Sequence, residues 1–266
     1  MNHALPKSLA ILGAALISAS AQAATTWVGT ANYGVETVGP FDSYDFGVGV
    51  ILLEAFSGTG GPTNPAAGDV FNGYLQSYVS GHSLGLTGVS ASNLNITGSG
   101  TGYELTLRAN FQETITNVTG TSVDFTIDSG SAEVYLDGSP DYSFVGDSGF
   151  SDGTAILNGS IVGGSGTVFG GVLGVTSIDV LITGYDTSVF HPDTIIAGSS
   201  VFTLQLTDGN NQFSGVSSVQ GNSVDSGDFL LSADGNLTLA AVPVPAAVWL
   251  FGTGLLGLLG MARRRH

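Results

Sequence analysis

Alternation of apolar and polar residues with a period of two constrains the fold of this chain more than any other feature. It is clearest in residues 103–116, where apolar side chains recur at every second position. These apolar residues are Leu105, Leu107, Ala109, Phe111 and Ile115. The same period recurs in residues 123–127 and 202–206. Because alternate side chains of a β-strand point to opposite faces, we expect antiparallel sheets with one buried face.

Further strand candidates are separated by clusters of Gly, Asn, Asp and Ser. They lie at residues 46–56, 70–79, 134–136, 155–162, 168–182 and 229–239. Helical periodicity is almost absent, and 41 glycines disfavour long helices by about 1 kcal/mol each relative to alanine. We therefore expect an all-β body at residues 24–242, folded as an antiparallel β-sandwich or a jelly roll. The pairs Gly163-Gly164 and Gly170-Gly171 fit bulges and hairpin turns equally well.

The acidic residues of the clearest strand do not form a pair. Glu104 and Glu113 fall on opposite faces by parity, so they do not match the two carboxylates of a glycosidase. Glu113 shares its face with Leu105 and Phe111. We expect it to be buried, to lie at a strand end, or to follow a bulge.

The first 23 residues have the organisation of a secretory signal peptide. Lys7 supplies a positive charge, and residues 8–18 form a short apolar stretch. Ala21 and Ala23 give the small-x-small pattern of a cleavage site. Eleven residues at about 1.5 Å each are too short for a stable membrane span. We expect cleavage before Ala24 and export of the rest of the chain.

A proline motif that begins at Val242 leads into residues 243–266, which continue with an apolar run and a basic end. The motif consists of Val242, Pro243, Val244, Pro245 and Ala246, and the basic end consists of Arg263, Arg264 and Arg265. The uncharged stretch 246–262 spans about 25 Å as a helix, the lower limit for crossing a membrane. The positive-inside rule places the arginines in the cytoplasm and the body outside. We expect a single membrane helix, acting either as a removable tag or as a permanent anchor.

The stretch VPVPAAVWLFGTGLLGLLGMARRR resembles the C-terminal sorting tags of PEP-CTERM proteins, in the variant that opens with Val-Pro-x-Pro-Ala. Val244 stands where the archetype of that family has Glu. The resemblance implies processing by an exosortase-like membrane enzyme and delivery to the cell surface. It also implies a Gram-negative bacterium that makes exopolysaccharide.

The charge of the body excludes one class of partner. Residues 24–242 hold all 21 acidic residues and a single base, Arg108, which gives a formal charge of −20. Such a surface cannot hold a phosphate backbone, so nucleic-acid binding is excluded. Binding of anionic lipid headgroups by the body is disfavoured for the same reason.

Calcium is the cofactor that the acidic loops favour. Four aspartates fall within 16 residues: Asp137, Asp141, Asp147 and Asp152. Calcium takes six to eight oxygen ligands from carboxylates, carbonyls and water, and it would relieve the repulsion within a body of −20. The alternative is that these residues only form turns, because Asp-Gly is a preferred turn sequence.

Catalytic motifs are missing from the body. It has no cysteine, no lysine and no Gly-x-Ser-x-Gly elbow set between a strand and a helix, and its only two histidines are His82 and His191. The two histidines have no neighbouring histidine with which to bind zinc. The sequence His191-Pro192-Asp193 is typical of a turn. We expect no enzymatic activity.

The body also resembles flocculation-associated PEP-CTERM proteins in residues 68–79, 103–107 and 149–154. That resemblance implies an extracellular-matrix protein that supports floc or biofilm formation together with exopolysaccharide. Two alternatives stay open. One is a carbohydrate-binding module, with a strip of exposed tyrosines drawn from Tyr33, Tyr44, Tyr74, Tyr78, Tyr142 and Tyr185. The other is a polysaccharide-degrading hydrolase with a carboxylate pair.

Overall fold

The structure is a computed structural model that describes residues 25–57, 64–98, 100–170, 173–195, 199–208 and 213–241. The expected signal peptide with its cleavage site, and the expected sorting tag with its membrane helix, lie outside these residues. Within the described part of the chain, no helix has the length and apolar character needed to cross a membrane.

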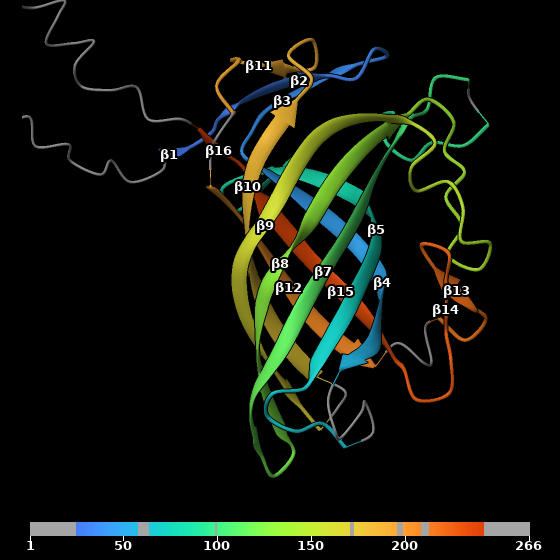
Figure 1. The fold of residues 1–266 in the computed structure, drawn as a ribbon. Coiled ribbons are helices and arrows are strands. Elements are labelled where there is room, and N and C mark those ends of the chain that lie inside the picture. Colours follow the sequence, from blue (N-terminus) through green and yellow to red (C-terminus); the bar gives the residue numbers. More distant parts are fainter. Residues whose placement is uncertain are drawn as a thin grey trace, which may run out of the picture.

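The body is all-β, as the alternation predicts, and eight long strands form a closed antiparallel barrel (Figure 1). Around the barrel they are β4 (Ser43–Ser57), β5 (Val70–Leu84), β7 (Glu104–Thr119), β8 (Ser122–Asp137), β9 (Thr154–Phe169), β10 (Leu173–Tyr185), β12 (Ser199–Asp208) and β15 (Phe229–Thr238). Each of these eight strands pairs with the one that follows it in the chain, and the last strand, β15, pairs with the first, β4, which closes the ring. The connectivity is therefore up-and-down.

The prediction of a sandwich or a jelly roll was wrong. Glycine-containing sequences typical of turns lie inside long strands, so the strands are fewer and longer than the sequence indicates. Ser129-Gly130 belongs to β8, next to a register shift between Gln112 and Glu113 of the paired strand. Gly235 lies within β15 beside another shift, between Ala233 and Gly235. Bulges of this kind bend and coil long strands without ending them. Strands of up to 16 residues can then wrap into one barrel, and no second sheet is needed.

The two glycine pairs differ in role. Gly163 and Gly164 lie within β9 beside a bulge: Gly163 pairs with Asp179 and Ile161 pairs with Val180, which leaves Val162 as the extra residue. Gly170 begins the connection from β9 to β10. The apolar run 168–182, a strand candidate in the sequence, is thus the end of one strand and most of the next.

One end of the barrel is closed by a small sheet. Strands β2 (Gly29–Asn32), β3 (Thr37–Phe41) and β11 (Phe190–His191) form this cap (Figure 1). Beneath it, the Trp27 ring packs edge-on against Phe41 and Phe190, with centroid distances of 5.4 and 5.9 Å. Strand β1 (Thr25–Thr26) pairs with β16 (Ala240–Ala241), so both ends of the body lie side by side.

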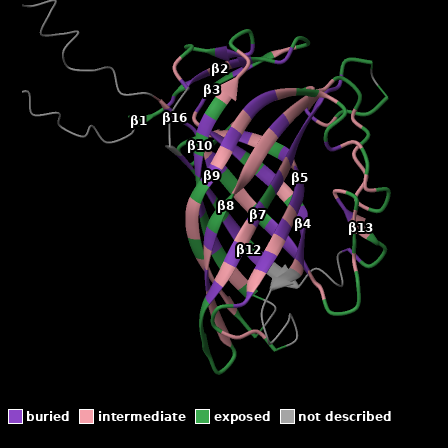
Figure 2. Ribbon diagram, in the orientation of Figure 1, coloured by how far each residue is buried: buried purple, intermediate pink, exposed green. Residues whose placement is uncertain are grey.

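A second apolar layer lies outside the barrel wall. Val50, Leu52 and Leu230 point outward from β4 and β15, yet they are buried. Residues 213–224 cover them, including the short strands β13 (Ser218–Val219) and β14 (Asn222–Ser223) (Figures 1 and 2). The remaining strand, β6 (Thr87–Val89), pairs with β5. The barrel therefore has apolar residues on both faces along one side.

Candidate functional site

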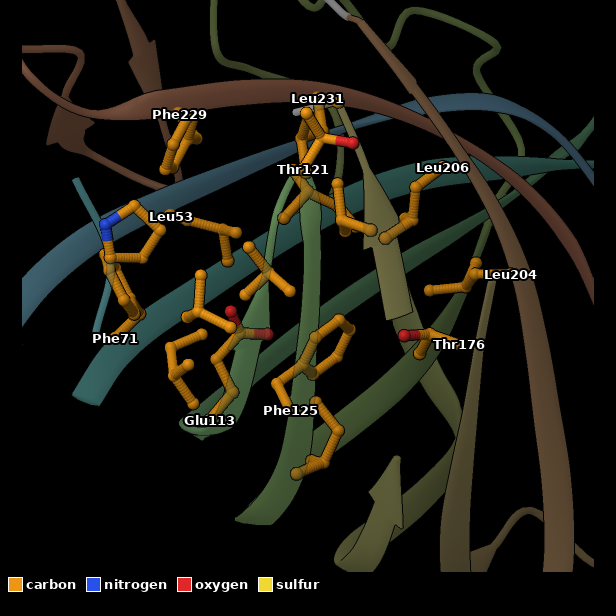
Figure 3. Close-up of a pocket in the computed structure, with 18 of the residues that line it drawn as sticks. Leu53, Phe71, Glu113, Thr121, Phe125, Thr176, Leu204, Leu206, Phe229 and Leu231 are labelled. Carbon is orange, nitrogen blue, oxygen red and sulfur yellow. The ribbon is translucent and has the colours of Figure 1, made fainter. Parts of the chain in front are cut away.

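A cavity lies inside the barrel, at the end opposite the cap. Its volume is about 410 Å³, and all eight barrel strands contribute to its lining. Most of the lining is aliphatic or aromatic, including Phe71, Phe125, Leu204, Leu206 and Leu231 (Figure 3). Gly120 and Thr121, which connect β7 to β8, also line it, so the cavity lies at the uncapped end. Its volume is within the range of about 300–1,000 Å³ typical of small-molecule sites.

The cavity exists because the barrel is filled unevenly along its axis. Halfway along, Phe46, Leu107, Val180 and Phe202 leave a gap of only about 20 Å³. Towards the uncapped end, β9 contributes Gly166 to the interior in place of a large side chain. A Cβ at Gly166 would come within 2.0 Å of Oγ1 of Thr176 and within 2.3 Å of the Phe125 ring, so glycine leaves room for both side chains.

Among the described residues that line the cavity, Glu113 carries the one carboxylate. It lies on β7 with 5% of its surface exposed, and Figure 3 shows its carboxyl group among apolar side chains. No group in the described part of the chain donates a hydrogen bond to it. Burial raises the pKa of Glu113 from its ordinary value of 4.5 to about 8, and the negative charge of Asp128 adds to this shift. At neutral pH the group is therefore mainly a neutral carboxylic acid, which can both donate and accept a hydrogen bond.

Thr176 supplies a second polar group to the same cavity. Its side chain points inward from β10, and its hydroxyl is buried without a hydrogen-bond partner in the described structure. Unpaired buried polar groups are rare in folded proteins and cost about 1–3 kcal/mol each. Glu113 and Thr176 thus give a mainly apolar cavity two unused hydrogen-bonding groups.

The capped end of the barrel holds a separate polar network that is already satisfied at most positions. The Tyr33 hydroxyl lies 2.8 Å from Nε2 of His82 and 3.1 Å from the Tyr44 hydroxyl. Burial lowers the pKa of His82 to about 4, so the imidazole is neutral at physiological pH. The other body histidine, His191, is exposed on β11. Neither histidine belongs to the one group of possible metal ligands found among the described residues.

The structure separates the four aspartates that the sequence groups together. Asp137 and Asp141 lie close to each other and to Glu104, with one carboxylate oxygen from each residue within 4.8 Å of the others. Asp147 lies elsewhere and accepts hydrogen bonds from the backbone N–H groups of Gln220 and Gly221, at 2.9 and 2.7 Å. Asp152 is outside the three-residue group, although its charge adds to the effect of burial in raising the pKa of Asp141.

The candidate tyrosines do not form an exposed strip. Tyr33 and Tyr44 are buried under the cap. The other four are half-buried: Tyr78 and Tyr142 stack on each other at 4.7 Å, whereas Tyr185 packs against Phe190. Glu104 and Glu113 lie on opposite sides of the barrel wall, as parity predicts.

A search of protein-family models finds no match to the chain, and neither the curated proteins nor the solved structures yield one. The function is therefore interpreted from the cavity and from the chemistry of its lining.

Proposed function

We propose that the chain is an exported, non-enzymatic binding protein whose barrel holds a small, mainly apolar molecule bearing one polar group. The observation that carries this proposal is the 410 Å³ apolar cavity with an unpaired, buried carboxyl group inside it. Transfer of an apolar molecule into such a cavity gains about 25 cal/mol for each Å² removed from water. The polar group of the ligand would pair with Glu113 and offset part of the cost of burying it.

The cellular setting that we propose is the cell surface and its extracellular polysaccharide matrix. The signal-peptide-like start and the PEP-CTERM-like end of the sequence support export, transient membrane anchoring and processing by an exosortase-like enzyme. The pairing of β1 with β16 brings the two ends of the body together beside the cap. An anchor attached there would leave the uncapped end, and with it the cavity, facing away from the membrane.

The binding proposal is tested with N-phenyl-1-naphthylamine, an apolar amine whose fluorescence rises in an apolar environment. Wild-type protein should increase its fluorescence with saturation at one probe per chain. Leu204→Trp places a larger side chain in the cavity and should weaken binding at least ten-fold.

Val201→Trp is the matched control, because Val201 lies on the same strand, β12, but is 40% exposed on the outside. This variant should bind like the wild type. Circular dichroism and thermal melting would show whether both variants are folded. Equal binding by the wild type and a folded Leu204→Trp variant would contradict a site inside the barrel.

A further inference from the structure

A group of three carboxylates lies on the outer side of the barrel wall, away from the cavity. Glu104 begins β7, Asp137 ends the neighbouring strand β8, and Asp141 follows in the loop of residues 138–153. The pairing of β7 with β8 places Glu104 directly opposite Asp137. One carboxylate oxygen from each residue lies within 4.8 Å of the other two.

Glu104 distinguishes this group from an ordinary acidic surface. Its side chain is fully buried, although it points outward from the barrel, because the 138–153 loop covers it. Oε2 accepts hydrogen bonds from the backbone N–H groups of Asp141 and Tyr142, at 3.1 and 3.4 Å. Oε1 is buried and has no hydrogen-bond partner in the described structure. A buried, unpaired carboxylate oxygen beside two further carboxylates lacks a positive counterpart.

The charged surroundings make this lack costly. The carboxylates of Asp137 and Asp141 lie beside the Glu104 carboxyl group, and two backbone N–H groups are the donors that it binds in the described structure. The one arginine of the body, Arg108, bonds instead to Ser151 and Gln220. No basic side chain in the described part of the chain therefore neutralises the group.

The spacing fits one class of cation. Oxygens bound to Ca²⁺ lie about 2.3–2.6 Å from the ion, so two ligands of one ion are at most about 5 Å apart. The three oxygens meet this limit. Mg²⁺ needs a tighter octahedron, with ligands at about 2.0–2.1 Å, and is rarely bound by protein carboxylates alone. Asp141 is exposed and Asp137 is half-buried, so water can complete the coordination.

We propose that Glu104, Asp137 and Asp141 bind a calcium ion that fastens the 138–153 loop to the barrel. The loop already contacts the wall at two further points. Tyr142 stacks on Tyr78 of β5, and the Thr106 hydroxyl donates to the carbonyl oxygen of Phe150 at 3.0 Å. Calcium would join the start of the loop to the end of β8 and so complete the attachment. The ion would then stabilise the outer layer without any role in the cavity.

The experiment measures thermal melting of the full-length protein in EDTA and in 2–5 mM CaCl₂ or MgCl₂, concentrations that would saturate a site of about millimolar affinity, as in extracellular modules. Calorimetric titration with calcium measures the affinity directly. Calcium should raise the melting temperature of the wild type by several degrees, and magnesium should raise it by much less. Glu104→Gln and Asp141→Asn should each lower calcium affinity at least ten-fold and abolish the rise.

Two comparisons separate this site from general effects of charge. Asp179→Asn removes an exposed carboxylate on β10, outside the group, and should keep the full calcium response. In EDTA, Glu104→Gln should melt at or above the wild-type temperature, since its amide oxygen can still accept the two N–H bonds while the repulsion is gone. Asp141→Asn, at an exposed position, gives a second reading if Glu104→Gln does not fold. The absence of a calcium-induced rise in the wild type, or an equal rise in all variants, would overturn the proposal.

Discussion

At the scale of single residues, Glu113 decides what the cavity can hold. A carboxyl group in an apolar cavity is neutral over most of the physiological pH range, because ionisation there lacks both water and a basic partner. A neutral acid can hydrogen-bond to an amide, a hydroxyl or another acid, and an ionised one would pair with an amine. The state of Glu113 thus links the pH of the surroundings to the class of ligand that is bound.

Glu113 should also make the protein less stable as the pH rises. Its pKa is near 4.5 in the unfolded chain and about 8 in the folded one, so between these values the folded state holds a proton that the unfolded state has lost. The free energy of unfolding should then fall by about 1.4 kcal/mol for each pH unit in this window. Glu113→Gln should remove this contribution and be more stable than the wild type at pH 8. Urea unfolding of both proteins at pH 5, 6, 7 and 8 measures the difference, and parallel curves would contradict it.

At the scale of elements, the long bulged strands determine the architecture. Gly130 shows why a turn signal can lie inside a strand: it faces the interior of the barrel and abuts the neighbouring strand. A Cβ at this position would come within 2.1 Å of the carbonyl oxygen of Asn110, which is backbone and cannot move aside alone. Glycine is needed here for close packing of β8 on β7.

Gly130→Ala should therefore destabilise the barrel by about 1–3 kcal/mol, the range typical of overpacking. Gly81→Ala is the matched control, because Gly81 also lies in a barrel strand and an added Cβ would meet nothing within 4 Å. That variant should be neutral or slightly stabilising, since alanine loses less backbone entropy on folding. Thermal or urea unfolding of both variants tests the pair. Similar destabilisation by the two would show that the bulge at Gly130 is not tightly packed.

The alternation in residues 103–116 was sufficient to predict β7 and the face of Glu113, because both depend on local periodicity alone. Closure of the barrel could not be predicted in the same way. It depends on the pairing of β4 with β15, strands from opposite ends of the body, and on where bulges shift the register. The cavity was also missed, since its volume depends on side chains from eight strands. Glu104 was placed on the polar face, but its burial depends on the loop that covers it.

At the scale of the whole molecule, the terminal segments and the barrel have separable roles. Deletion of residues 242–266 should release the body to the medium or leave it in the periplasm, because the deleted segment holds the expected anchor and sorting motif. Fractionation of producing cells followed by immunoblotting measures this. Unchanged retention of the truncated protein at the cell surface would contradict the proposed sorting.

The central claim is that the barrel interior binds an apolar ligand, and methyl-labelled NMR tests it most directly. Addition of N-phenyl-1-naphthylamine should shift the methyl signals of the cavity residues Leu53, Leu204 and Leu231. Leu52 is next to Leu53 on β4 and Leu230 is next to Leu231 on β15, but both face the outer layer, so their signals should move little. Shifts confined to these outer leucines, or no shifts at a saturating concentration of the probe, would contradict the account.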